Sequence, residues 1–189
     1  AKAQGLKIRV VYNTSGYERV ETLKNLEGIV DVYLPDFKYT DTTYAKRYSN
    51  APDYFDVTKA ALAEMVRQHP TPQFADKQEA AVRGIEEGIM TGGVIVRHLM
   101  LPGLLKDTKA VIRYLYETYG DSIYVSIMNQ YTPMPFVENI PGLNRKVTPR
   151  EYDKAVDYAI GLGVVNGFIQ EGGTAKESFI PEFSGEGLE

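Results

Sequence analysis

Two hydrophobic periodicities alternate along the chain. Nearly continuous apolar runs of the β type cover residues 6–13, 30–39, 93–103, 122–131 and 164–171. Between them lie stretches with apolar residues at helical spacing, such as Val20, Leu23 and Leu26, after which Gly28 is a suitable stop. The β-type runs are too apolar to face water. The alternation therefore predicts an α/β fold, with a parallel sheet of roughly five strands, outer helices and the curvature of a partial (βα) barrel.

Polar residues and prolines mark the expected helix ends. A helical stretch in two parts follows the second run, with a break at Ala51-Pro52 and Asp53 as N-cap of the second part. Asp107 is expected to cap the next helix, which Gly120 closes. The motif Thr148-Pro149-Arg150-Glu151 is a capping box with proline at the first helical position, and it opens the last helix.

The chain is expected to form a single domain, residues 1–189, with two interruptions. Residues 70–92 are too long for a simple connection, and their glycines favour a hairpin or flap. Residues 132–147 hold three prolines and follow a strand, which is typical of a functional loop, although a tolerated surface excursion is the alternative. The tail at 174–189 is expected to be irregular.

Composition restricts the classes of function. With 43% hydrophobic residues, 24% charged residues and a net charge of −4, the chain has a globular balance and no basic stripe for nucleic acid or an anionic membrane. No apolar run approaches the ~18 residues of a membrane span, and residues 1–9 lack a signal-peptide core, so a cytoplasmic protein with a small soluble ligand is expected. Cysteine is absent, so the chain alone can form neither a disulfide nor a thiolate-ligated cluster.

Polar residues gather where the predicted strands end, and the carboxyl ends of parallel strands share one rim. These residues are Asn13, Thr14, Ser15, Asp36, Lys38, Arg97, Asn129, Gln130, Tyr131, Gln170 and Glu171. Amide, hydroxyl, carboxylate and cationic groups therefore converge, which predicts a site for a polar, hydroxyl-bearing ligand.

Asp36, Lys38 and Arg97 are the charged residues of this rim. Asp36 and Lys38 are two positions apart, so strand alternation places them on one face, either as a ligand site or as a local ion pair. Arg97 interrupts an apolar strand, where a guanidinium needs a nearby anion. It could anchor a ligand carboxylate or form an internal ion pair with Asp36. If Arg97 faces the barrel, His98 points outward beneath the helices, where packing is its expected role.

Other chemistries have little support in the sequence. His69 and His98 are the only histidines and lie on different elements, so a histidine-rich metal site is not expected. There is no G-x-S-x-G nucleophile motif, and neither a G-x-G-x-x-G nor a P-loop spacing occurs.

Five sequence blocks resemble one protein family. They are YNTSGYE at 12–18, DVYLPDFKY at 31–39, KRYSNAPDYF at 46–55, GVIVRHLMLPG at 93–103 and SIMNQYTP at 126–133. In this order, over roughly residues 5–140, they are similar to the C-terminal part of radical S-adenosylmethionine proteins related to the pyruvate formate-lyase activating enzyme, in particular PflX-type homologues.

The resemblance implies a TIM-like barrel that binds S-adenosylmethionine and a [4Fe-4S] cluster held by a C-x-x-x-C-x-x-C loop. It implies an oxidoreductase that makes a 5′-deoxyadenosyl radical and, in the activating enzymes, removes hydrogen from a glycine of a partner protein. By the family's pattern, Asn13, Thr14 and Ser15 form a polar turn, and Asp36 and Lys38 lie near the ribose and methionyl groups. Arg97 lies near the carboxylate, and Gln130 and Tyr131 border the adenine and the substrate opening.

The chain also departs from the family, because it lacks the cluster cysteines and a Gly-Gly-Glu motif. It therefore looks like a truncated part of a radical SAM barrel. We expect it to be inactive alone, to have no catalytic residue of its own, and to bind S-adenosylmethionine weakly or not at all. Truncation would also expose the strand edge at residues 7–13, through which the chain could dimerise.

Two other classes of function remain open. A non-redox α/β barrel enzyme acting on a phosphorylated or sugar substrate would use Asp36 as base and Lys38 as electrophile. A non-catalytic binding module would hold its partner at residues 132–147.

Overall fold

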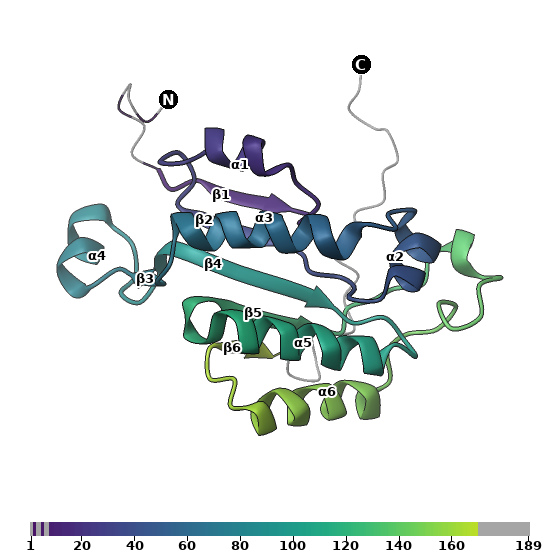
Figure 1. The fold of residues 1–189 in the computed structure, drawn as a ribbon. Coiled ribbons are helices and arrows are strands. Elements are labelled where there is room, and N and C mark those ends of the chain that lie inside the picture. Colours follow the sequence, from purple (N-terminus) through teal and green to yellow (C-terminus); the bar gives the residue numbers. More distant parts are fainter. Residues whose placement is uncertain (1, 3–4, 6–7, 170–189) are drawn as a thin grey trace, which may run out of the picture.

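The computed structural model describes Lys2, Gly5 and residues 8–169, which form a parallel α/β sheet with helices (Figure 1). Five parallel strands stand in the order β1-β2-β4-β5-β6. They are β1 (Val11–Thr14), β2 (Val32–Pro35), β4 (Met90–Leu99), β5 (Tyr124–Met128) and β6 (Gly167–Ile169). The predicted fold class is confirmed, although β1 and β2 are shorter than the apolar runs that predicted them.

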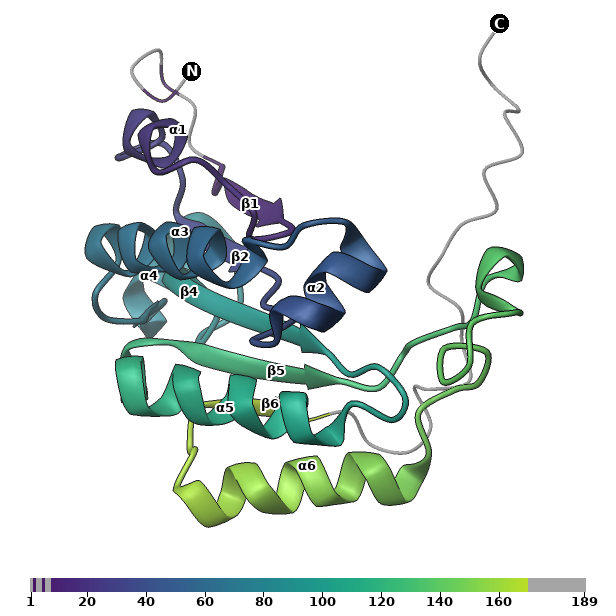
Figure 2. The ribbon, with the colours of Figure 1, turned by 45° about the vertical axis from the view of Figure 1, so that its right-hand side comes forward.

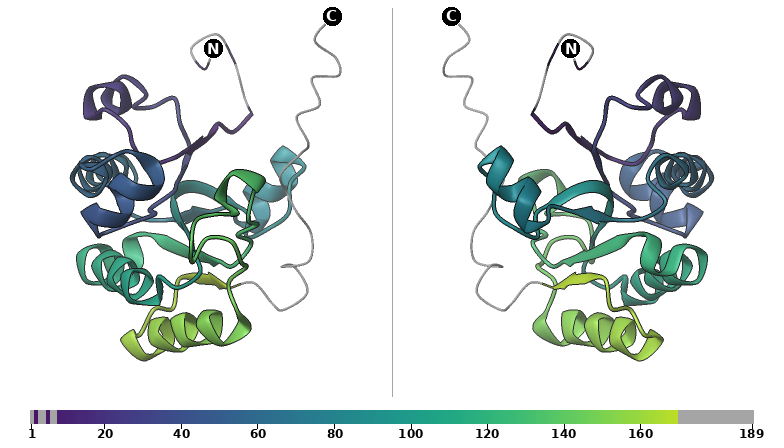
Figure 3. Two further views of the ribbon diagram at one scale, coloured as in Figure 1. Left: turned by 90° about the vertical axis from the view of Figure 1, so that its right-hand side faces the viewer. Right: turned by 90° about the vertical axis from the view of Figure 1, so that its left-hand side faces the viewer.

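Helices cover one side of the curved sheet. The α-helices are α1 (Val20–Asn25), α2 (Thr42–Ser49), α3 (Tyr54–Gln68), α4 (Lys77–Arg83), α5 (Leu105–Tyr119) and α6 (Pro149–Leu162), with 3-10 turns η2 (Gly120–Ser122) and η3 (Pro135–Val137). Seen end on, the strands form an arc with α1, α3, α5 and α6 on its outer side (Figure 3). Among the described residues, no helix combines the length and apolar character needed to cross a bilayer.

The core lies between the sheet and these outer helices. Along β4, Val94, Val96 and His98 are buried, whereas Ile95, Arg97 and Leu99 alternate with them and are only half-buried. Val94 and Val96 pack with residues of α3 and α5 in the main apolar cluster. The predicted directions of Arg97 and His98 are therefore confirmed, because a strand places successive side chains on opposite faces.

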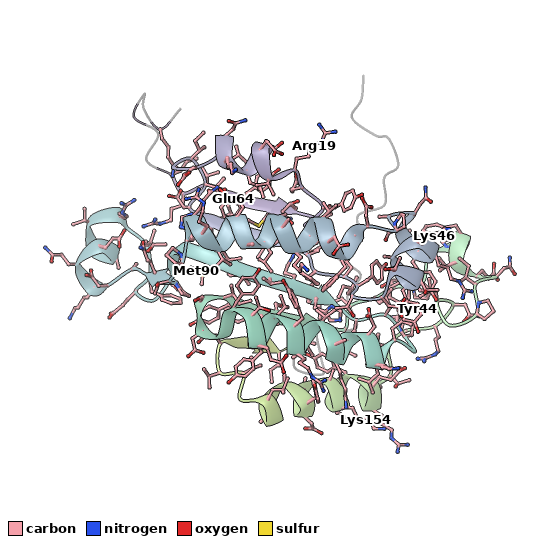
Figure 4. The ribbon with its side chains drawn as sticks, in the orientation of Figure 1. Arg19, Tyr44, Lys46, Glu64, Met90 and Lys154 are labelled. Atoms are coloured by element: carbon pink, nitrogen blue, oxygen red, sulfur yellow. The ribbon has the colours of Figure 1, made fainter. Side chains whose placement is uncertain are left out.

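The two ends of the sheet differ in what surrounds them. At the amino end, β3 (Gln73–Phe74) pairs antiparallel with the start of β4 at Gly92 and Met90, and α4 follows it. At the carboxyl end lie α2 and residues 132–147 (Figures 1 and 2). Tyr44 of α2 and Met90 of β4 mark these opposite ends in Figure 4.

Helix ends agree with the sequence in most places. Thr148 and Glu151 form the predicted capping box, Gly120 follows the last residue of α5, and α3 ends before Pro70. Asp53 occupies the N-cap position of α3 but makes no capping hydrogen bond there, and it accepts one from the Tyr17 hydroxyl at 2.6 Å.

The prediction that Asp107 caps α5 is wrong. The N-cap position belongs to Leu104, and Asp107 lies in the first turn of the helix. Its buried carboxylate instead accepts hydrogen bonds from the amides of Thr40 and Asp41, across the connection that follows β2. A carboxylate that satisfies two amides of another segment has no need to cap its own helix.

Candidate functional site

Three neighbouring strands bring Asn13, Asp36 and Arg97 together on the open face of the sheet. Asp36 follows β2 and forms an isolated parallel bridge with Arg97 of β4. The Arg97 Nη2 lies 2.7 Å from Asp36 Oδ1 and donates a hydrogen bond to Asn13 Oδ1 at 2.6 Å. The internal ion pair between Arg97 and Asp36, one of the two roles predicted for Arg97, is confirmed.

Lys38 lies on the same face but outside this ion pair. Half-buried and buried positions alternate from Leu34 to Lys38, so Asp36 and Lys38 share one side, as predicted. A local Asp36–Lys38 pair is nevertheless absent, because the parallel register puts Arg97 directly beside Asp36. Among the described residues, no carboxylate comes within ion-pair distance of the Lys38 ammonium. Arg97 thus pairs with the Asp36 carboxylate, and Lys38 is left for an anionic ligand.

Tyr54 of α3 ties the ends of β1 and β2 to each other. Its hydroxyl lies 2.9 Å from the Ser15 carbonyl and 3.2 Å from the Asp36 carbonyl, to which it can donate, and it accepts from the Lys38 amide at 3.1 Å. Burial raises the pKa of Tyr54, so the hydroxyl stays protonated and can donate. Sequence reasoning missed this residue, because one tyrosine among 14 carries no distinguishing signal.

Of the polar residues predicted at 13–15, only Asn13, which lies in β1, joins the polar group. The Thr14 hydroxyl is buried on the helix side and donates to Glu18 Oε1 at 2.5 Å. Ser15 is exposed, and its hydroxyl accepts a long hydrogen bond from the Tyr17 amide. The structure therefore does not bring the Thr14 and Ser15 hydroxyls to Arg97.

Beyond β5, Gln130 and Tyr131 are half-buried at the carboxyl end of the sheet. The Tyr131 hydroxyl donates to the Leu143 carbonyl at 2.8 Å, so it anchors the loop at 132–147. Its ring is left for ligand contact, but its hydroxyl is already used. The candidates Gln170 and Glu171 lie outside the described residues.

The rim has polar atoms that a ligand could satisfy. Arg97 Nε is buried and has no acceptor among the described residues. Asp36 Oδ1 receives no well-aligned hydrogen bond, although the guanidinium is close enough for an ion pair. Ligand hydroxyls and a carboxylate match the hydrogen-bonding chemistry of these groups and of Lys38.

An iron-sulfur cluster does not fit this chain alone. The sequence has no cysteine thiolates, which are the usual cluster ligands. Within the part of the chain that the structure describes, no three or more histidine and acidic side chains gather as a metal site. Any cluster would need ligands from another segment.

Comparisons with known proteins found a distant relative by sequence and a solved structure with a similar fold. No protein-family model matches the chain. A protein of Methanocaldococcus jannaschii, described as uncharacterized, is 32% identical over 152 residues, which make up 80% of this chain and 38% of that protein. The chain thus spans less than half the length of this relative.

A crystal structure of a domain of the pyruvate-formate lyase-activating enzyme from Bacteroides vulgatus has a similar fold. The TM-score is 0.54 at 14% identity, and the match covers 90% of this chain and 84% of that domain. At this identity the likeness shows the fold alone. The chain is an α/β domain with about five parallel strands and flanking helices, arranged as in that domain.

Proposed function

We propose that this chain is part of a radical S-adenosylmethionine enzyme of the pyruvate formate-lyase activating type. The observation that carries the proposal is the Asn13, Asp36 and Arg97 group, with the unpaired cation Lys38 beside it, on the open face of a partial barrel. The five sequence blocks and the likeness to an activating-enzyme domain support the same assignment.

In this proposal, different residues of the rim bind different parts of S-adenosylmethionine. Lys38 binds the carboxylate of the methionyl group, because its charge is not neutralised by Asp36. Asp36 and Asn13 accept hydrogen bonds from the ribose hydroxyls, and Arg97 fixes both residues while its Nε donates to a ligand oxygen. The chemistry that S-adenosylmethionine supplies, once bound beside a reduced cluster, is a 5′-deoxyadenosyl radical.

The thiolates for the cluster would come from a segment outside these 189 residues. The M. jannaschii relative is long enough to include such a segment, because 62% of it lies outside the match (100% less the 38% matched). We propose that the chain alone is inactive. In the intact protein, the substrate would be a glycine of a partner protein, reached from the side bounded by residues 132–147.

The test is to purify, without oxygen, the intact gene product that contains these residues. We expect iron and sulfide in the ratio of one [4Fe-4S] cluster and, after reduction, conversion of S-adenosylmethionine to methionine and 5′-deoxyadenosine. The 189-residue chain, treated identically, is the control and should hold no iron and form neither product. An intact protein without iron, or turnover of a sugar phosphate by the chain alone, would contradict the assignment.

A further inference from the structure

The segment that carries Lys38 is held at both ends by buried polar side chains from β4 and α5. On one side, His98 Nδ1 lies 2.8 Å from the carbonyl oxygen of Phe37. On the other side, the Asp107 carboxylate accepts hydrogen bonds from the amides of Thr40 and Asp41 and from the Thr40 hydroxyl. Lys38 lies between these two attachments.

The hydrogen bonds around His98 define its tautomer. A carbonyl oxygen can only accept, so Nδ1 carries the hydrogen that Phe37 receives. His98 Nε2 is then an acceptor, and the Thr108 hydroxyl, 3.0 Å away, is its donor. Burial lowers the pKa of His98, which keeps the ring neutral.

The His98 ring supplies a hydrogen bond to the Phe37 carbonyl that strand pairing does not make. β2 ends at Pro35, and beyond it the Phe37 amide still donates to the Arg97 carbonyl at 2.8 Å. The Phe37 carbonyl instead receives the His98 side chain. A leucine would fill an apolar strand position at lower cost, since a buried imidazole must be hydrogen-bonded on both nitrogens. The His98 bond to the Phe37 carbonyl and the bond from the Lys38 amide to the Tyr54 hydroxyl hold the two ends of the peptide that leads to Lys38.

We infer that His98, supported by Thr108 and Asp107, is a positioning residue that aims the Lys38 ammonium at the open face beside Asp36 and Arg97. His98 contacts no ligand in this arrangement, because it lies wholly on the helix side of the sheet. The inference rests on the proposed function only for the identity of the ligand that Lys38 meets.

The test compares His98→Leu with His98→Asn, whose amide can still donate to Phe37. In amide hydrogen exchange followed by NMR, His98→Leu should speed exchange at Phe37 and Lys38 about tenfold or more. The Val125 amide, which donates to the Asn166 carbonyl next to β6 of the same sheet, is the reference and should not change. His98→Asn should restore the slow rates. Equal rates in wild type and His98→Leu, or no rescue by asparagine, would overturn the inference.

A measurement on the unmodified protein covers the case in which His98→Leu does not fold. The nitrogen-15 shifts of His98 should report hydrogen on Nδ1, and hydrogen on Nε2 alone would overturn the inference. Titration of S-adenosylmethionine into the intact protein separates the two claims. If amide exchange in the variants is as expected but the Lys38 signals do not move, S-adenosylmethionine is not the ligand of Lys38. The positioning role of His98 then stands. If the Lys38 signals move on addition of S-adenosylmethionine, but amide exchange in His98→Leu is as slow as in wild type, the inference about His98 is wrong.

Discussion

Gly16→Ala is expected to destabilise the protein by about 3 kcal/mol or more, because a side chain here meets both strain and backbone. Gly16 has a φ of +78°, and a Cβ at this position would lie 2.2 Å from the carbonyl oxygen of Asp36. Neither the glycine turn nor Asp36 can move freely, since Tyr54 contacts the Ser15 and Asp36 carbonyls together. The change would therefore displace Asp36 and weaken its pairing with Arg97.

Gly28→Ala is the matched control for this prediction. Gly28 has nearly the same φ, +75°, but an added Cβ would have no atom within 4 Å. Gly28→Ala should therefore lower the free energy of unfolding only by the strain of alanine at positive φ, about 1 kcal/mol. Urea unfolding of both variants gives the comparison. Equal losses in the two variants would mean that the contact with Asp36 has no energetic effect.

Arg97→Met should cost about 2 kcal/mol, because it leaves the Asp36 carboxylate without its partner. The side chains of Arg97 and Asp36 are only 24% and 22% exposed, so solvent compensates for a lost partner in part. Replacing both residues, as Asp36→Leu with Arg97→Met, should destabilise less than Arg97→Met alone, since no unpaired charge remains.

A double-mutant cycle by chemical denaturation checks the prediction. The coupling between positions 36 and 97 should be about 1 kcal/mol or more. Arg97 also bonds Asn13, so Asn13→Ala is measured in the same series to separate the two contacts. Additive losses at 36 and 97 would contradict the ion pair.

The sheet could be predicted because each strand leaves a pattern of its own. The apolar runs around β4 and β5 identify strands of a parallel sheet, and alternation alone places Arg97 and His98 on opposite sides. For the ionic partner of Asp36, the sequence left two options, Lys38 and Arg97. Which cation lies beside it depends on the register between β2 and β4, and no local pattern encodes that register.

Residues that act through long-range contacts could not be found in the sequence. Asp107 looks like a helix cap, yet it bonds to Thr40 and Asp41, 67 and 66 positions away. Tyr54 binds carbonyls of two different strand ends, which come together only in the fold. Thr14 and Ser15 share the polar character of Asn13, but a strand end turns successive side chains in different directions. Spacing therefore identifies the rim, and three-dimensional contacts decide which of its residues meet.

The central claim is that Lys38 is the cation that holds S-adenosylmethionine on this rim. The most direct measurement is the dissociation constant of S-adenosylmethionine for the intact gene product as wild type, Lys38→Met and Lys154→Met. Lys154 is an exposed residue of α6, on the outer side of the sheet, and its replacement changes the net charge equally (Figure 4). Lys38→Met should weaken binding about tenfold or more, the loss of a charge-assisted contact, while Lys154→Met should bind like wild type. Unchanged affinity in Lys38→Met, or the same loss in both variants, would contradict the claim.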